Sequence, residues 1–137
     1  MQPVIGFDGQ QAGVDDFFLN VPPTMPGSGL VFDVRGRQMG SRAFAKRGVV
    51  FAGRWHHVAV LADSVRGQAA FHVDGREVTA QPGLRQGFKL AAPLLIGHRV
   101  KNGPLPFDGQ LDDLRIYGRA LTAAEIAALA EGKTATK

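Results

Sequence analysis

Trp55-His56-His57-Val58-Ala59-Val60-Leu61-Ala62 is the stretch that decides the fold of this chain. It is rich in apolar and β-branched residues, and it has the length of a buried strand rather than that of a globular helix. Gly53-Arg54 precedes it and Asp63-Ser64 follows it, so turn signals bound both ends. The stretch therefore predicts a strand in the core of a β protein.

A hairpin follows this strand. Residues 68–73 predict a second strand, which ends at Asp74-Gly75. An Asp-Gly pair between two strands indicates a type I′ turn, because that turn needs positive φ at both central residues. Residues 76–79 then return as a third strand, so the middle of the chain predicts an antiparallel meander.

The rest of the chain repeats this pattern of short apolar runs between turns. Its 137 residues include 18 glycines and 8 prolines, which fits many short strands joined by turns. Further strands are expected at 4–7, 17–21, 30–34, 38–44, 49–51, 88–90, 94–96 and 110–117. Together these signals predict an all-β fold, an antiparallel β-sandwich, in a single domain over residues 1–132, with a disordered tail at 133–137.

One helix is predicted near the C-terminus. Thr122 and Glu125 form a capping box, in which each side chain accepts a hydrogen bond from the backbone of the other residue. Ile126 and Leu129 form an apolar stripe, and Gly132 suits the position after the last turn. We expect this helix to cover an open end or edge of the sandwich.

Composition limits the classes of function. The chain has no cysteine, which excludes disulfides and thiolate zinc sites, and no apolar run approaches the roughly 20 residues of a membrane span. Residues 1–6 lack the features of a signal peptide, so we expect a cytoplasmic chain or a mature or excised piece of an exported protein. Much of the net charge of +4 lies between Asp33 and Arg54. This region is either a groove for an anionic polymer or a solvated face; we favour the solvated face and expect no nucleic-acid partner.

Five motifs in the second half occur in the order of a known family. They are Trp55-His56-His57-Val58-Ala59, Val73-Asp74-Gly75, Leu95-Ile96-Gly97, the run 107–117, and Arg119-Ala120-Leu121-Thr122 with Glu125-Ile126. With this order and spacing, residues 50–130 resemble the laminin-G-like jelly-roll domain of the concanavalin A-like lectin/glucanase superfamily. Residues 1–50 depart from that family, because they are short for it and lack its usual tryptophan-bearing strand.

The resemblance implies a non-catalytic binding module. Such modules bind carbohydrates or proteins, often as parts of larger secreted or cell-surface bacterial proteins, and some relatives hold calcium. We therefore expect a carbohydrate- or protein-binding module, part of or derived from a larger exported bacterial protein, that works outside the cell or on its surface. The alternative is a structural domain that forms homo-oligomers through an open strand edge left by the short front part.

A polysaccharide-active enzyme is a third alternative, and the acidic residues count against it. Glycoside hydrolysis needs two carboxylates at a set separation. Asp112 and Asp113 are neighbours, so on a strand they point to opposite faces and do not flank one glycosidic bond. We expect no catalytic residues.

The two adjacent histidines are expected to be structural. His56 and His57 cannot chelate one ion from the same face of a strand, so we expect one of them to face inward and to hydrogen-bond to a backbone group. The full set of residues with a predicted structural role is Trp55, His56, His57, Asp74, Gly75, Gly109 and Asp112. The candidates for contact with a ligand are Arg76, Arg99 and Tyr117.

Alternation within the expected strands also predicts a core and a candidate metal site. The core residues are Trp55, Val58, Val60, Phe71, Val73, Ile96, Leu114 and Ile116. The same parity directs Asp112 toward the core, where a carboxylate needs donors or a cation. Two alternatives follow for Asp112: hydrogen-bond donors from neighbouring strands, or calcium at the rim, held by Asp112, backbone carbonyls and Asp8.

Overall fold

The central meander forms as the sequence predicts. The computed structural model describes residues 2–7, 16–21, 30–35, 40–45, 48–84, 86, 94–99 and 105–132. Its meander consists of β5 (Val58–Asp63), β6 (Gln68–Val73) and β7 (Arg76–Pro82), which pair antiparallel in chain order. Asp74 and Gly75 have φ of 51° and 79°, as the tight turn between β6 and β7 requires.

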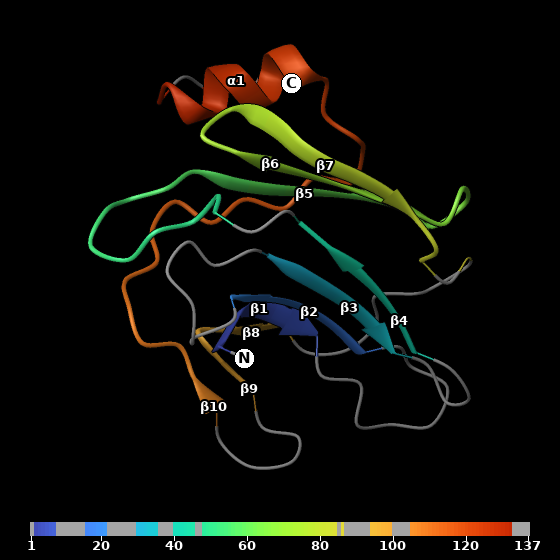
Figure 1. Ribbon diagram of the computed structural model, residues 1–137, viewed down its shortest axis with the longest axis horizontal. Coiled ribbons are helices and arrows are strands. Elements are labelled where there is room, and N and C mark those ends of the chain that lie inside the picture. The colour runs from blue at the N-terminus through green and yellow to red at the C-terminus, as the bar shows by residue number, and fades with distance from the viewer. Residues whose placement is uncertain are drawn as a thin grey trace.

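A second sheet lies across from the meander. Its five strands are β1 (Gln2–Phe7), β2 (Asp16–Val21), β3 (Val31–Arg35), β4 (Gly40–Phe44) and β8 (Leu94–Ile96). They pair antiparallel in the order β4-β3-β2-β1-β8. Figure 1 shows the two sheets as two layers, and β4 contacts β7 across them. A small hairpin of β9 (His98–Arg99) and β10 (Leu105–Pro106) extends beyond β8.

The core fills the space between the two sheets. Alternate residues Ala69, Phe71 and Val73 of β6 are buried, as expected for the inner face of a strand. They pack with buried residues of the opposite sheet and its flanks, which are Leu30, Phe32, Ala43 and Ala45, and with Leu84. The predicted core residues Val58 and Val60 pack against this cluster, while Phe71 and Val73 belong to it. The antiparallel β-sandwich predicted from the sequence is therefore confirmed.

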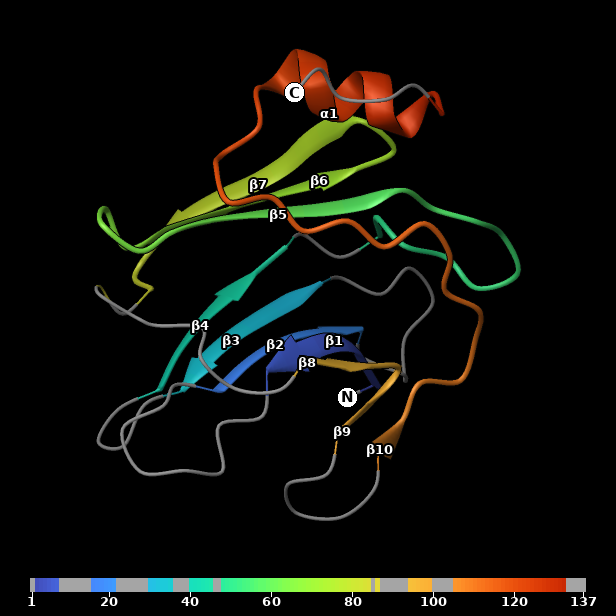
Figure 2. The ribbon, with the colours of Figure 1, turned by 180° about the vertical axis from the view of Figure 1, so that it is seen from behind.

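The C-terminal helix forms where the capping box predicts it. Helix α1 (Ala123–Ala130) begins after Thr122, and Gly132 follows its last turn with φ of 78°. Ile126 is fully buried, and the helix contacts β7. Figures 1 and 2 show α1 on the far side of the meander from the five-stranded sheet. The helix therefore covers the outer face of the meander rather than an open end of the sandwich.

The strand expected at residues 110–117 is not present. Residues 107–121 form no strand and run along the side of the sandwich next to β5, from β10 to α1 (Figure 2). Asp113 has a φ of 49°, which interrupts the extended backbone and its alternation. Leu114 and Ile116 are 47% and 58% exposed, so the prediction that they belong to the core was wrong.

Two further core predictions were wrong. Trp55 is 63% exposed, because it lies before the first residue of β5 and strand alternation does not apply to it. Ile96 is half exposed, because β8 is the terminal strand of its sheet and Ile96 is its last residue. The expected strand at 88–90 and the tail at 133–137 lie outside the residues that the structure describes.

Candidate functional site

The loop before β5, which we call the Trp55 loop (residues 48–57), exposes two aromatic side chains beside the first strand of the meander. It projects beyond the edge of the two sheets, on the left of Figure 1. Residues 51–55 are all exposed, and they include Phe51 and Trp55. The Arg54 guanidinium carbon lies over the Phe51 ring, 4.8 Å from its centroid. The loop therefore presents two aromatic side chains and one cation to solvent.

His56 anchors this loop from inside. Its side chain is only 5% exposed. Its Nε2 accepts hydrogen bonds from the backbone N of Phe51 (3.0 Å) and from Nε of Arg54 (3.1 Å). Because Nε2 is the acceptor, Nδ1 carries the proton of the neutral ring, and it donates to Oδ2 of Asp74 at 2.8 Å. One histidine ring thus joins the loop to the turn between β6 and β7.

Asp74 completes this connection. Its Oδ1 accepts from the backbone N of His57 at 3.0 Å, and its own backbone N donates to the carbonyl O of His57 at 2.8 Å. The positive φ of Asp74 places it in the tight turn, and Gly75 beside it packs under α1. The Trp55 loop is therefore held by a turn that is itself fixed by the helix.

His57, just before β5, and His72, in β6, are two further histidines with buried ring nitrogens. Within the described residues, Nδ1 of each ring is buried without a hydrogen-bond partner. Burial lowers the pKa of His57, against the attraction of Asp74 and Asp113, and Arg115 and His72 lower it further. Burial also lowers the pKa of His72, although Glu77 lies 3.9 Å from its Nε2. Both rings are therefore held in the neutral form.

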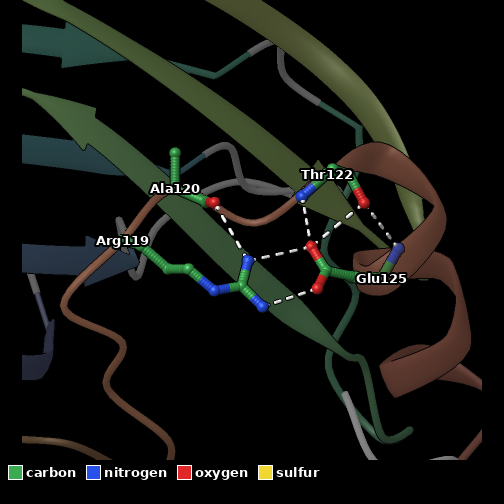
Figure 3. Close-up of polar contacts among 4 residues, drawn as sticks. All are labelled: Arg119, Ala120, Thr122 and Glu125. Atoms are coloured by element: carbon green, nitrogen blue, oxygen red, sulfur yellow. Dashed lines mark hydrogen bonds and ion pairs between the residues drawn. The ribbon is translucent and has the colours of Figure 1, made fainter. Parts of the chain in front are cut away.

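A tight ion pair lies at the start of α1 (Figure 3). The Arg119 guanidinium donates to both carboxylate oxygens of Glu125, at 2.6 and 3.0 Å. Glu125 also accepts from the backbone N of Thr122, and its own backbone N donates to the Thr122 hydroxyl. These donors, Arg119 first, lower the pKa of Glu125 to about 2. Arg119 is thus occupied in capping the helix.

The predicted ligand residues do not meet. Arg76 is exposed at the start of β7, and Tyr117 is 38% exposed in the segment 107–121. Arg99 lies in β9, and its side chain is outside the description. Among the described side chains, no contact joins Arg76 to Tyr117.

Gly109, predicted to be structural, lies beside the Phe107 ring, where a Cβ would approach Cε1 to 2.6 Å.

Asp112 does not face the core. It is exposed, and its Oδ1 accepts from the backbone N of Asp113 at 2.8 Å. The prediction of a buried carboxylate was wrong, because the segment is not a strand and parity does not direct its side chains. Asp8 lies outside the described residues. Among the residues that are described, no three histidine, aspartate or glutamate side chains gather as metal ligands would.

These features define a class of protein: an antiparallel jelly-roll sandwich with an exposed, firmly anchored aromatic loop. A family model described as the concanavalin A-like lectin/glucanases superfamily, of the laminin G type, matches residues 2–127. The chain belongs to this family. Laminin G-like domains are non-catalytic binding domains, which agrees with the prediction that the chain is not an enzyme.

Two similar proteins are consistent with this membership. Human pentraxin-4 is 34% identical over 89 residues, a match that covers 59% of this chain and 19% of pentraxin-4. A crystal structure of an S-layer domain-containing protein (residues 221–444) from Clostridium thermocellum superposes with a TM-score of 0.52 at 20% identity. That match covers 95% of this chain and 62% of the other, and it bears on the fold alone.

The sequence motifs did not indicate the site that the structure brings together. Phe51 and Arg54 lie outside the family motifs quoted above, and the stacking of one on the other depends on the loop conformation. One signal was present: Gly48 and Gly53 flank Phe51, both have positive φ, and Arg54 directly follows Gly53.

No helix within the described parts of the chain has the length and apolar character needed to cross a membrane.

Proposed function

We propose that the chain is a non-catalytic module that binds a carbohydrate or a protein partner outside the cell or at its surface, as part of a larger exported bacterial protein. Membership of the family over residues 2–127 supports a binding role. The pentraxin-4 match, which covers 19% of that protein, is in keeping with a module of this kind within a longer chain.

The observation that carries the proposal is the Trp55 loop. Tryptophan is highly buried on average, and tryptophan and arginine are enriched in binding hot spots. Here Trp55 follows an arginine whose Nε is hydrogen-bonded to the buried His56. A loop that is held before the partner arrives loses less conformational entropy on binding.

A binding screen tests this function. The labelled protein is applied to an array of glycans and to a panel of extracellular proteins, and each signal is followed by a titration. We expect saturable, reversible binding to at least one glycan or protein. Release of products from a bound polysaccharide, or no binding to any glycan or protein, would contradict the proposal.

Self-assembly is the second candidate function. Strand β4, from the front part of the chain, is at one end of the five-stranded sheet, and strand edges favour pairing with other chains. The segment 107–121, which lies beside β5, also exposes Leu111, Leu114 and Ile116. Light scattering over a range of concentrations tests this candidate. A mass that rises with concentration, and falls back in Ile116→Lys, is expected for assembly, whereas a constant monomer mass would contradict it.

Calcium binding by Asp112 and Asp8 stays a prediction. The exposed Asp112 carboxylate offers oxygen atoms of the kind that calcium prefers. If calcium is part of the folded protein, a chelator lowers the melting temperature, and Asp112→Asn removes that sensitivity. A melting temperature that does not respond to the chelator would contradict calcium binding.

A further inference from the structure

Three exposed side chains within residues 51–55 of the Trp55 loop have the chemistry of a small recognition surface. Phe51 is 41% exposed and Trp55 is 63% exposed, and Arg54 lies between them in the sequence. The Arg54 guanidinium sits over the Phe51 ring, which fixes the cation beside an aromatic face. The loop thus combines apolar flat surfaces with one positive charge.

The guanidinium of Arg54 keeps donors for a ligand. Its bond to His56 uses Nε, so the two terminal nitrogens take no part in it. Within the described residues, no carboxylate forms an ion pair with Arg54. The Asp74 carboxylate instead accepts hydrogen bonds from the His56 ring and from the backbone N of His57. An arginine with unpaired terminal nitrogens matches a carboxylate, which accepts two parallel N–H bonds.

The surface is preorganised by groups that do not face a ligand. The His56 ring accepts hydrogen bonds from Nε of Arg54 and from the backbone N of Phe51. It donates in turn to the Asp74 carboxylate. His56 is therefore a positioning residue. Because these bonds already hold the loop, a ligand need not order it.

The size of the surface favours a sugar over a folded protein. Protein interfaces of ordinary stability use about 20–30 residues on each side. The exposed run of the loop is residues 51–55, and Arg54 is its only charged member. One or two sugar rings cover such a run, with their apolar faces against the aromatic rings and a carboxylate on the cation.

We propose that the Trp55 loop binds carboxylate-bearing sugar units, so that the ligand class of this module is a uronic-acid polysaccharide. Trp55 contacts the apolar face of a sugar ring, and the terminal nitrogens of Arg54, which lies over the Phe51 ring, bind the uronate carboxylate. This inference rests on the proposed binding function. The basic region of the sequence that ends at Arg54 allows two alternatives, and this inference favours the first of them for Arg54: a surface that binds an anionic polymer.

Titration of the full chain with a galacturonate oligosaccharide tests the inference. Trp55 is the only tryptophan, so its fluorescence reports binding at this loop directly. We expect a saturable blue shift of its emission with the oligosaccharide. The methyl-esterified oligosaccharide, which lacks the negative charge, is expected to bind about tenfold more weakly or worse, because its hydrogen bonds to Arg54 are no longer charge-assisted on both sides.

Variants with matched controls locate the site. Calorimetric titration is expected to show a loss of about tenfold or more in affinity for Arg54→Gln and for Trp55→Ala. The controls are Arg66→Gln and Val65→Ala, which change an exposed arginine and an exposed apolar residue at the other end of β5. Both controls are expected to bind like the unmodified protein. Circular dichroism melts confirm that each variant is folded.

Several results would overturn the inference. They are no response to the uronate, equal binding of the methyl ester, unchanged affinity in Arg54→Gln, or tighter binding of an acidic peptide at the same loop. If Trp55→Ala retains full binding to a partner found in the array or protein panel, the inference fails and the proposed function stands. If the array and panel detect no partner at all, the proposed function itself fails.

Discussion

The Asp74 carboxylate joins the β6–β7 turn to His56 and His57, which lie 18 and 17 residues earlier in the chain. It accepts from the ring of His56 and from the backbone of His57. Asp74→Ala leaves both donors without this acceptor and places alanine at a positive φ. We expect the free energy of unfolding, measured by urea denaturation, to fall by about 1–3 kcal/mol.

Asp74→Asn is the matched control for that change. Asparagine keeps one acceptor oxygen and tolerates positive φ, so it is expected to lose less stability than alanine does. Equal losses for the two variants, or an unchanged stability of Asp74→Ala, would contradict the role given to the carboxylate.

The buried histidines make stability depend on pH. Their pKa values in the folded chain lie below the ordinary value of 6.5, so the unfolded chain takes up protons first as the pH falls. We expect the free energy of unfolding to be constant above about pH 7 and to fall between about pH 6.5 and pH 5, above the range where carboxylates titrate. Denaturation series at several pH values measure this.

His72→Gln identifies the group responsible. Glutamine does not titrate in this range, so the variant is expected to lose less stability on acidification than the unmodified protein. The same slope in the variant would show that His72 does not contribute, and a flat profile for the unmodified protein would show that neither ring controls the pH response.

At the scale of single residues, the sequence was informative where strand pairing is regular. Alternation predicted Phe71 and Val73 as core residues, and both are buried. Trp55 lies outside the paired part of β5, where alternation carries no information. The contact of Arg54 with Phe51 depends on a loop conformation that is set by the distant Asp74 through His56, and no local pattern encodes it.

Among the elements, the β6–β7 turn and α1 depend on each other. Gly75 has a φ of 79°, and a Cβ there would lie 3.1 Å from Cα of Ala127 and 3.2 Å from Cβ of Ala130. Gly75→Ala therefore strains the turn and pushes on the helix. We expect a loss of about 1–3 kcal/mol in the free energy of unfolding, measured by thermal or urea denaturation.

Gly48→Ala separates the two causes. Gly48 has nearly the same φ, 81°, but no atom lies within 4 Å of the position of an added Cβ. It is expected to lose less stability than Gly75→Ala. Equal losses would mean that the contact with α1 contributes nothing.

The elements that the sequence predicted best are those with local signals. The capping box of α1 needs only Thr122 and Glu125, and the tight turn needs only Asp74 and Gly75. The expected strand at 110–117 had the right alternation, but a strand also needs a paired neighbour. The positive φ of Asp113 shows that the backbone leaves the extended conformation there.

For the whole molecule, stability depends on the core between the two sheets. Phe71 is fully buried and packs in a cluster that includes residues from both layers. Phe71→Ala is expected to reduce the free energy of unfolding by about 3–5 kcal/mol, through lost burial and the cavity left behind. Val65→Ala, at an exposed position, is the control and should change little. A loss below about 1 kcal/mol for Phe71→Ala would contradict this core.

The fold of the whole molecule could be predicted because the motifs that make the meander and the helix occur in the order of the family. The ligand surface could not be predicted in the same way, because a fold does not fix which loops bind. The sequence suggested Arg76, Arg99 and Tyr117 one by one, and no contact among the described side chains joins Arg76 to Tyr117. Phe51 and Arg54 come together through the buried His56, and the exposed Trp55 follows Arg54 in the chain.

The fluorescence of Trp55 in the free protein tests the exposed, anchored loop most directly, because it is the only tryptophan in the chain. With 63% of the residue exposed, the native protein is expected to emit at a long, water-like wavelength. Acrylamide is expected to quench it readily, and unfolding in urea is expected to shift the emission little. A blue-shifted native emission that resists quenching and moves to longer wavelength on unfolding would place Trp55 in the core and contradict the exposed loop.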